Sequence, residues 1–201
     1  MSGRRLVVAV TGASGALYAV RFLKACLEGG IDIDLVVSDY GHRLLIEECG
    51  LNLKVDSVHA HLERTCGPAH RPGTVTRHSE HDLGASVASG SQPRDGMVVI
   101  PCSMKTLSGV ARGAASNLIE RAADVALKER WPLVLVPREC PLNLIQIENL
   151  RAAAAAGAAI VPAMPAFYFG PRTLEDLADF VCGRVLQVLG FPHALFPAWQ
   201  G

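Results

Sequence analysis

The stretch Leu6-Val-Val-Ala-Val-Thr-Gly-Ala-Ser-Gly-Ala16 decides the fold, because a short aliphatic run is closed by a turn of small residues. Apolar residues then recur at helical spacing over 16–28, which predicts a strand, a tight turn and a helix in succession. A parallel strand that is buried on both faces has this kind of continuous aliphatic sequence. The segment therefore predicts the first β-loop-α unit of an α/β protein.

The same alternation continues along the chain. Gly50 is expected to end the second helix. Thr106 is expected to cap a helix that begins after residue 101, and Asn117 to cap the helix that follows it. Alternating strands and helices imply parallel crossovers, so we predict a three-layer, doubly wound, Rossmann- or flavodoxin-like sheet in a single domain over residues 1–201. The expected strands are 6–10, 34–38, 96–101, 133–136 and 158–161, the later helices are 118–130, 142–156 and 173–189, and an elaborated connection over roughly 52–91 contains a strand near Val75.

Composition narrows the function classes. The chain has 201 residues, half of them apolar, and its 19 basic residues cancel its 19 acidic ones, so the totals predict no nucleic-acid or membrane partner. Six cysteines without a CxxC pair favour reduced thiols in the cytoplasm. The first aliphatic run is too short for an export signal. The uncharged stretch 152–170 is interrupted by glycine and proline, so we interpret it as helix, turn and strand.

Two turns of small residues are candidates for binding an anion. Gly12 and Gly15 flank Ser14 where the first strand ends and a helix begins, and Pro101-Cys-Ser-Met-Lys-Thr106 repeats this arrangement after another strand. Carboxyl ends of parallel strands and helix N-termini suit phosphate groups. Ser38 ends the second strand at the same edge. A ligand-free turn and ordinary helix capping by Ser103 and Thr106 remain alternatives, as does a dinucleotide site in which Asp39 binds the ribose.

Charged residues near the end of the predicted sheet suggest a second part of the site. Arg121 and Lys128 are seven residues apart and share a helix face, while Arg138 and Glu139 follow the next strand. Together they would form a cationic pocket with one carboxylate. The alternative makes Arg121 a surface charge and pairs Asp124 with Lys128 in a solvated bridge.

A metal site is not favoured. Imidazole and thiolate groups occur close together in one polar stretch, but their spacing matches no standard zinc module. We therefore expect no metal, although a zinc site remains the alternative for His59, His61, Cys66 and His70.

The longer motifs of the chain are similar to those of one family, the UbiX-type flavin prenyltransferases, over nearly the whole length. Several long blocks in the right order are more specific than a single glycine turn. The blocks that carry the resemblance are Thr11-Gly-Ala-Ser-Gly-Ala16, Ala88-Ser-Gly-Ser91, Pro101-Cys-Ser-Met-Lys-Thr-Leu-Ser108, Asn117 to Arg130, Pro132-Leu-Val-Leu-Val-Pro-Arg-Glu139 and Pro165-Ala-Phe-Tyr168.

The resemblance implies an activity. Such enzymes join reduced FMN to dimethylallyl phosphate through new bonds at flavin N5 and C6, and the fourth ring gives prenylated FMN for UbiD-type decarboxylases. The family needs no metal, and its members are often dodecamers. Whether the donor is the monophosphate or the pyrophosphate stays open.

The resemblance also implies residue roles. Glu48 is expected to reach the site of a neighbouring subunit. The chemistry itself needs cations on the leaving phosphate, which Lys128, Arg138 and Arg184 can supply, and a carrier for the proton lost on ring closure, for which we choose Glu139, with the departing phosphate as the alternative base. Ser14 joins Glu48, Lys128 and Glu139 as a catalytic candidate. The FMN contacts carried over are Gly12, Ala13, Ser14, Ser38, Ser103, Met104, Lys105, Thr106 and Arg138. The donor contacts carried over are Ser89, Gly90, Arg121, Lys128, Arg138, Tyr168 and Arg184.

Two local features depart from the family pattern, the histidine-rich stretch 59–81 and Leu83. Leu83 stands where some relatives have an aromatic residue beside the prenyl pocket, and Trp199 is a candidate to supply a ring face instead. Two other functions stay open: a flavin-dependent cysteine decarboxylase, whose catalytic histidine and Asn-rich motif we do not find, and a non-catalytic FMN carrier.

Overall fold

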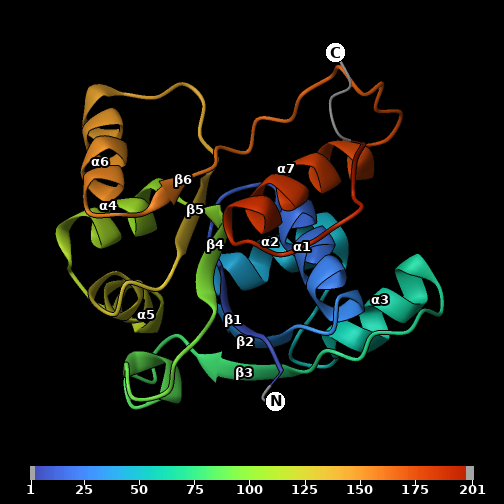
Figure 1. Ribbon diagram of the computed structural model, residues 1–201, viewed down its shortest axis with the longest axis horizontal. Coiled ribbons are helices and arrows are strands. Elements are labelled where there is room, and N and C mark those ends of the chain that lie inside the picture. The colour runs from blue at the N-terminus through green and yellow to red at the C-terminus, as the bar shows by residue number, and fades with distance from the viewer. Residues whose placement is uncertain (1–2, 198–201) are drawn as a thin grey trace.

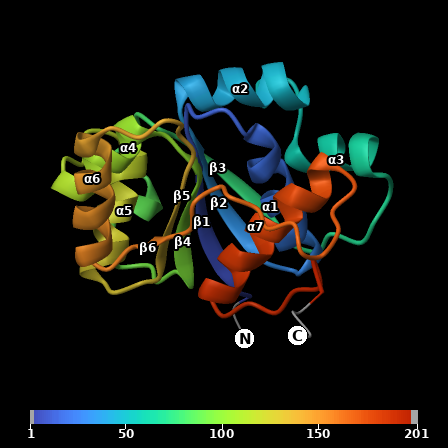
Figure 2. The ribbon, with the colours of Figure 1, turned by 90° about the horizontal axis from the view of Figure 1, so that it is seen from above.

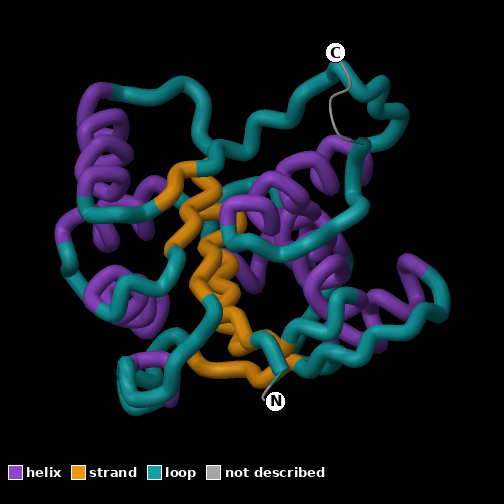
Figure 3. The backbone as a smooth tube through the Cα atoms, viewed as in Figure 1, coloured by secondary structure: helices purple, strands orange, loops and turns teal. Residues whose placement is uncertain are grey.

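The protein folds on a six-stranded sheet in the computed structural model, which describes residues 3–197 (Figures 1 and 3). The strand order is β3-β2-β1-β4-β5-β6 and all neighbouring strands are parallel. The predicted doubly wound α/β fold is confirmed, and its topological switch point lies between β1 and β4. The strands are β1 (Arg5–Val10), β2 (Asp32–Val37), β3 (Val75–Ser79), β4 (Gly96–Cys102), β5 (Leu133–Pro137) and β6 (Ala159–Ile160).

Helices cover both faces of the sheet, which gives the three layers visible in Figure 2. Side chains of β1 alternate between the two cores: Leu6, Val8 and Val10 enter one, and Val7 and Ala9 enter the other. Burial on both faces explains why β1 is a continuous aliphatic run. On the first face lie α1 (Ala16–Glu28), α2 (Asp39–Cys49), α3 (Val58–Cys66) and α7 (Leu174–Val188), and on the second lie α4 (Met104–Arg112), α5 (Leu118–Lys128) and α6 (Leu144–Ala155).

The elaborated connection is more ordered than its sequence suggests. It contains β3 near Val75, as predicted, but also α3 and the short 3-10 turn η1 (Ser86–Ala88), which the sequence did not predict. A buried ion pair anchors it, because Arg94 Nε donates to Asp34 Oδ2 at 2.7 Å and His78 Nε2 lies 2.8 Å from Asp34 Oδ1. These contacts tie β3 and the segment just before β4 to the middle of β2.

The uncharged stretch 152–170 belongs to this fold. It forms the end of α6, the short strand β6 and the beginning of the long loop toward α7 (Figure 3). Across residues 3–197, we find no helix with the length and apolar character needed to cross a bilayer.

Candidate active site

The carboxyl ends of β1 and β4 are joined by one buried threonine. Thr11 Oγ1 donates to the Pro101 carbonyl at 2.8 Å and accepts the Ser103 N–H at the same distance. Thr11 is only 1% exposed. Because its hydroxyl serves both strands, it sets the separation of the two turns at the switch point. Sequence reasoning missed this role, since only the fold brings residue 11 beside 101 and 103.

Serine hydroxyl groups cap two of the helices that start at this edge. Ser38 Oγ accepts the Gly41 N–H of α2, and Ser103 Oγ accepts the Thr106 N–H of α4. The expectation that Thr106 caps α4 was wrong: Ser103 has the extended backbone of an N-cap, whereas Thr106 lies inside the first turn. Ser103 Oγ and Thr106 Oγ1 are 3.1 Å apart, so both hydroxyls lie at the same corner.

A glutamate caps α1. Glu48 Oε2 accepts the N–H groups of Gly15 at 2.8 Å and Ala16 at 2.7 Å. Burial alone would raise the pKa of Glu48, but these N–H groups, Ser14 and Arg138 together outweigh it and lower the pKa. The helix N-terminus thus holds a carboxylate of its own chain. The family resemblance implied that Glu48 serves a neighbouring subunit; in the single chain it contacts its own α1, and the role in the neighbour stays a prediction.

Arg138 and Glu139 follow β5 at the same edge. Arg138 Nε donates to the Ser14 carbonyl at 2.8 Å, so the guanidinium is held against the first turn. Glu139 Oε1 accepts the N–H of Cys140, the next residue, at 3.1 Å. The fold therefore brings together Ser14, Glu48, Arg138 and Glu139, four of the residues predicted for the site.

A cavity of about 420 Å³ opens beside these turns. Hydroxyl groups of Ser38, Ser103 and Thr106 line it together with the ammonium group of Lys105. In the part of the chain that the structure describes, the N–H groups of Met104 and Lys105 have no hydrogen-bond partner, because Ser103 satisfies those of the following residues. A set of hydroxyls, one ammonium group and a free helix N-terminus matches the acceptor oxygens of a phosphate monoester. The lining thus fits the phosphate of FMN, and it includes five of the nine predicted FMN contacts.

Acidic residues also border this cavity. Glu120 is 4% exposed and accepts the N–H and hydroxyl of Ser116 at 2.9 and 2.6 Å, which fixes the start of α5. Glu80 Oε1 accepts the Asp39 N–H at 2.6 Å, and the Glu80 carbonyl accepts the Leu118 N–H at 2.8 Å. Sequence reasoning missed Glu80, because nothing in the pattern around β3 marks it.

Four of the seven predicted donor contacts lie together around α5. Arg121 Nε donates to the Ala88 carbonyl at 3.2 Å, and Lys128 Nζ pairs with Glu129, whose carboxylate also lies against Gly90. Ser89 continues the same loop. We call Ser89, Gly90, Arg121 and Lys128 the α5 group. A solvated Arg121–Asp124 pair at 2.9 Å is present, and Lys128 pairs with Glu129 instead of Asp124.

The prediction of one compact pocket from Arg121, Lys128, Arg138 and Glu139 was wrong for the single chain. The 11-residue helix α5 begins at the carboxyl edge of the sheet, beside the cavity, and ends where Pro132 leads into β5. An α-helix of this length rises about 16 Å. Lys128 therefore lies near the opposite edge of the sheet from Arg138, and its side chain is about half exposed.

The remaining predicted residues lie in the C-terminal region. Tyr168 makes edge-to-face contacts with Phe169 and Phe180, at ring distances of 5.8 and 6.0 Å. Arg184 projects from α7 into a groove of about 350 Å³ that Met164 also lines. Leu83 is about half exposed, in the connection before η1. Trp199 lies outside the described residues.

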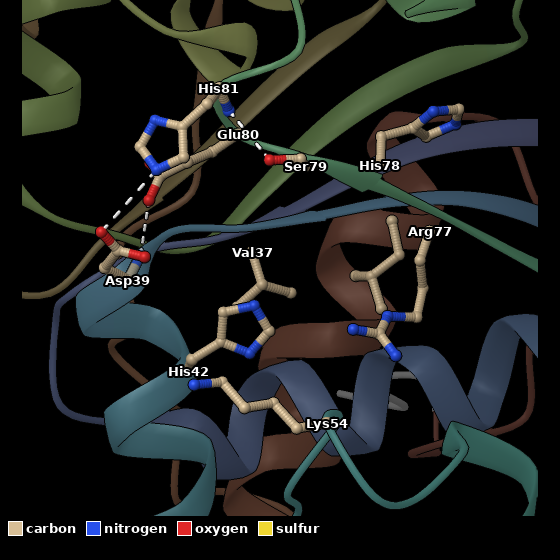
Figure 4. Close-up of a pocket in the computed structure, with 10 residues that line it drawn as sticks. Val37, Asp39, His42, Lys54, Arg77, His78, Ser79, Glu80 and His81 are labelled. Atoms are coloured by element: carbon tan, nitrogen blue, oxygen red, sulfur yellow. Dashed lines mark hydrogen bonds and ion pairs between the residues drawn. The ribbon is translucent and has the colours of Figure 1, made fainter.

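The zinc alternative has no support from the geometry. His59 Nε2 contacts the Gly73 carbonyl at 2.9 Å, while His61 is buried in α3 and its Nδ1 has no hydrogen-bond partner among the described residues, so the two rings do not converge on one point. Over residues 3–197, the group of potential metal ligands that converges is a different one, Asp39, Glu80 and His81. Figure 4 shows it at one end of a second cavity of about 340 Å³, with His42, Lys54 and Arg77 at the other end.

This parallel sheet, with a cavity lined by hydroxyl groups at its switch point, defines a Rossmann-like α/β protein of the flavoprotein type. The family model described as Flavoprotein matches residues 1–186. Flavin prenyltransferase UbiX of Pseudomonas aeruginosa is 45% identical over 202 residues, which cover 99% of this chain and 96% of that protein. The chain belongs to the UbiX family of flavin prenyltransferases.

Solved structures agree with this assignment. The crystal structure of AnUbiX (PadA1) in complex with FMN and dimethylallyl pyrophosphate has a TM-score of 0.88 at 39% identity and covers 99% of this chain and 98% of that one. A dodecameric FMN-dependent UbiX-like decarboxylase from Escherichia coli O157:H7 has a TM-score of 0.85 at 41% identity, over 98% and 99% of the two chains. The cysteine decarboxylase TvaF, with 17% identity and a TM-score of 0.56 over 93% and 98% of the two chains, shares only the fold.

Proposed function

We propose that this chain transfers a dimethylallyl group to reduced FMN and that the flavin phosphate binds in the 420 Å³ cavity at the switch point. The observation that carries the proposal is the donor set of this cavity: the hydroxyls of Ser38, Ser103 and Thr106, the Lys105 ammonium group and the free N–H groups that begin α4. The bound flavin supplies nucleophilic ring positions N5 and C6. The chain then has to hold the phosphates, orient the donor and remove a proton.

The residues beside the cavity suit these tasks. Arg138 is held against the Ser14 carbonyl, so its remaining N–H groups can bind a donor phosphate in a fixed position. Glu139 follows directly and carries the carboxylate that we assign to proton transfer. As phosphate leaves, negative charge develops on it, and fixed cations stabilise that charge better than mobile water does. The experiment below compares dimethylallyl monophosphate with dimethylallyl pyrophosphate as the donor.

Lys128 requires a second subunit. It lies near the opposite sheet edge from Arg138, so one chain cannot bring both cations to one phosphate. The helix α6 supports assembly, because Leu144, Ile145 and Ile147 are 71, 66 and 47% exposed on it. We propose that a homo-oligomer, a dodecamer as in the E. coli relative, brings the α5 group of one subunit to the sheet edge of another.

The experiment is an anaerobic incubation of the protein with reduced FMN and either dimethylallyl monophosphate or dimethylallyl pyrophosphate. The flavin is then extracted and its mass measured. We expect one five-carbon unit to be added with at least one donor, and the product to activate a UbiD-type decarboxylase. A protein that binds FMN but returns it unmodified with both donors would instead be a flavin carrier.

A further inference from the structure

Glu80 lies where two helices begin at the rim of the 420 Å³ cavity. Its side chain accepts the Asp39 N–H of α2 at 2.6 Å, and its backbone carbonyl accepts the Leu118 N–H of α5 at 2.8 Å. Because both ends of the residue are held, its carboxylate has a defined place beside the cavity. Figure 4 shows it between Asp39 and His81.

The charges around this rim are mostly negative. Asp39 and Glu120 also line the cavity, and Lys105 is the one permanent cation in its lining. His81 Nε2 lies 3.8 Å from Asp39 Oδ2, and this pair is largely exposed. A flavin phosphate in the cavity would therefore meet Lys105 on one side and the Glu80 and Asp39 carboxylates on the other.

Three of the helix N-termini near this edge, those of α1, α2 and α4, differ in what they hold. Glu48 caps α1 and Glu80 caps α2, while the first N–H groups of α4 stay free within the described chain. A phosphate attracted by helix N-termini has to share the edge with two carboxylates. Of these two, only Glu80 lines the cavity.

We propose that Glu80 is an affinity-determining residue of the flavin site: its carboxylate competes with the flavin phosphate for the α2 N-terminus and weakens FMN binding through like-charge repulsion. This inference rests on the proposed function, because it takes the cavity as the FMN phosphate site. Removing the charge should strengthen binding of a flavin that carries a phosphate. Binding of riboflavin, which carries none, should stay the same.

The test measures dissociation constants of FMN and riboflavin by flavin fluorescence for the wild type, Glu80→Gln and Glu80→Ala. The glutamine keeps an oxygen that can accept the Asp39 N–H, so it removes charge while preserving that hydrogen bond. We expect both variants to bind FMN about three- to tenfold more tightly, the range for a charge near a helix terminus. Glu63→Gln, at an exposed position on α3 outside the cavity lining, serves as the matched control and should change nothing.

Each outcome separates two explanations. If Glu80→Gln leaves FMN affinity unchanged and Glu80→Ala weakens it, Glu80 only orders α2 and the proposal is overturned. Equal tightening for FMN and riboflavin would also overturn it, because a change in pocket shape would then be the cause. Failure of the wild type to bind FMN at all would instead contradict the proposed function.

Discussion

Thr11 is the residue on which the geometry of the switch point depends most. Its hydroxyl makes two 2.8 Å hydrogen bonds between the ends of β1 and β4, and the Thr11 side chain is buried. We expect Thr11→Val to reduce the free energy of unfolding by about 1–3 kcal/mol, because buried partners lose their hydrogen bonds. Thr11→Ser retains the hydroxyl and should lose less. Denaturant unfolding together with FMN titration measures both effects; equal stability and affinity in the two variants would contradict the role.

Glu48 should make stability depend on pH at the acid end. Its pKa is lowered in the folded chain, so its contribution is complete above the unfolded value of about 4.3 and is lost as the pH falls through the lower folded value. We expect Glu48→Gln to melt below the wild type at pH 7. The gap in melting temperature should close below pH 4. A gap that is the same at both pH values would show that charge is not the cause.

At the scale of elements, two serines that both cap a helix N-terminus allow the effect of capping on stability to be separated from an effect on FMN binding. Ser103 caps α4 beside the cavity, and Ser57 caps α3, accepting the Ala60 N–H away from it. Either serine replaced by alanine should lose about 1 kcal/mol of unfolding free energy. Only Ser103→Ala should also weaken FMN binding. Paired thermal melts and FMN titrations test this, and an equal loss of affinity in both variants would argue against a phosphate site at α4.

The strands and helices show which parts of the fold the sequence could predict. Aliphatic runs such as 6–10 and 133–136 marked the buried strands, because burial on both faces leaves no polar positions. The helix α3 was missed, since its nine residues include histidines and charges and only Val58, His61 and Leu62 are buried. Its existence depends on Val58 and Leu62 joining the hydrophobic core on the first face of the sheet, which the local pattern does not contain.

Sequence could predict the site residues that follow strand ends. It could not predict those whose position depends on the direction in which a helix runs. Ser14, Ser38 and Ser103 follow strands, so their convergence came from topology. Arg121 and Lys128 share a helix face, but a helix that runs back across the sheet carries its last residue to the other edge. Thr11 and Glu80 act through contacts over long sequence separations, and no spacing rule points to them.

At the scale of the whole molecule, the central claim is that prenyl transfer takes place where the sheet edge of one subunit meets the α5 group of another. Glu139→Gln impairs the part of the site at the sheet edge, and Lys128→Ala impairs the part contributed by the α5 group. Each homo-oligomer should therefore form little product. A mixed oligomer should contain some sites in which both halves are intact, about a quarter of them for random equal mixing.

The most direct measurement is the yield of prenylated flavin from such mixed oligomers. The two variants are co-expressed with different tags and purified through both tags, with doubly tagged wild type as the control for assembly. The yield with reduced FMN and the dimethylallyl donor is measured by mass spectrometry. We predict recovery to about a quarter of the wild-type yield. Mixed oligomers no more active than either variant alone, beside an active wild-type control, would contradict the shared site.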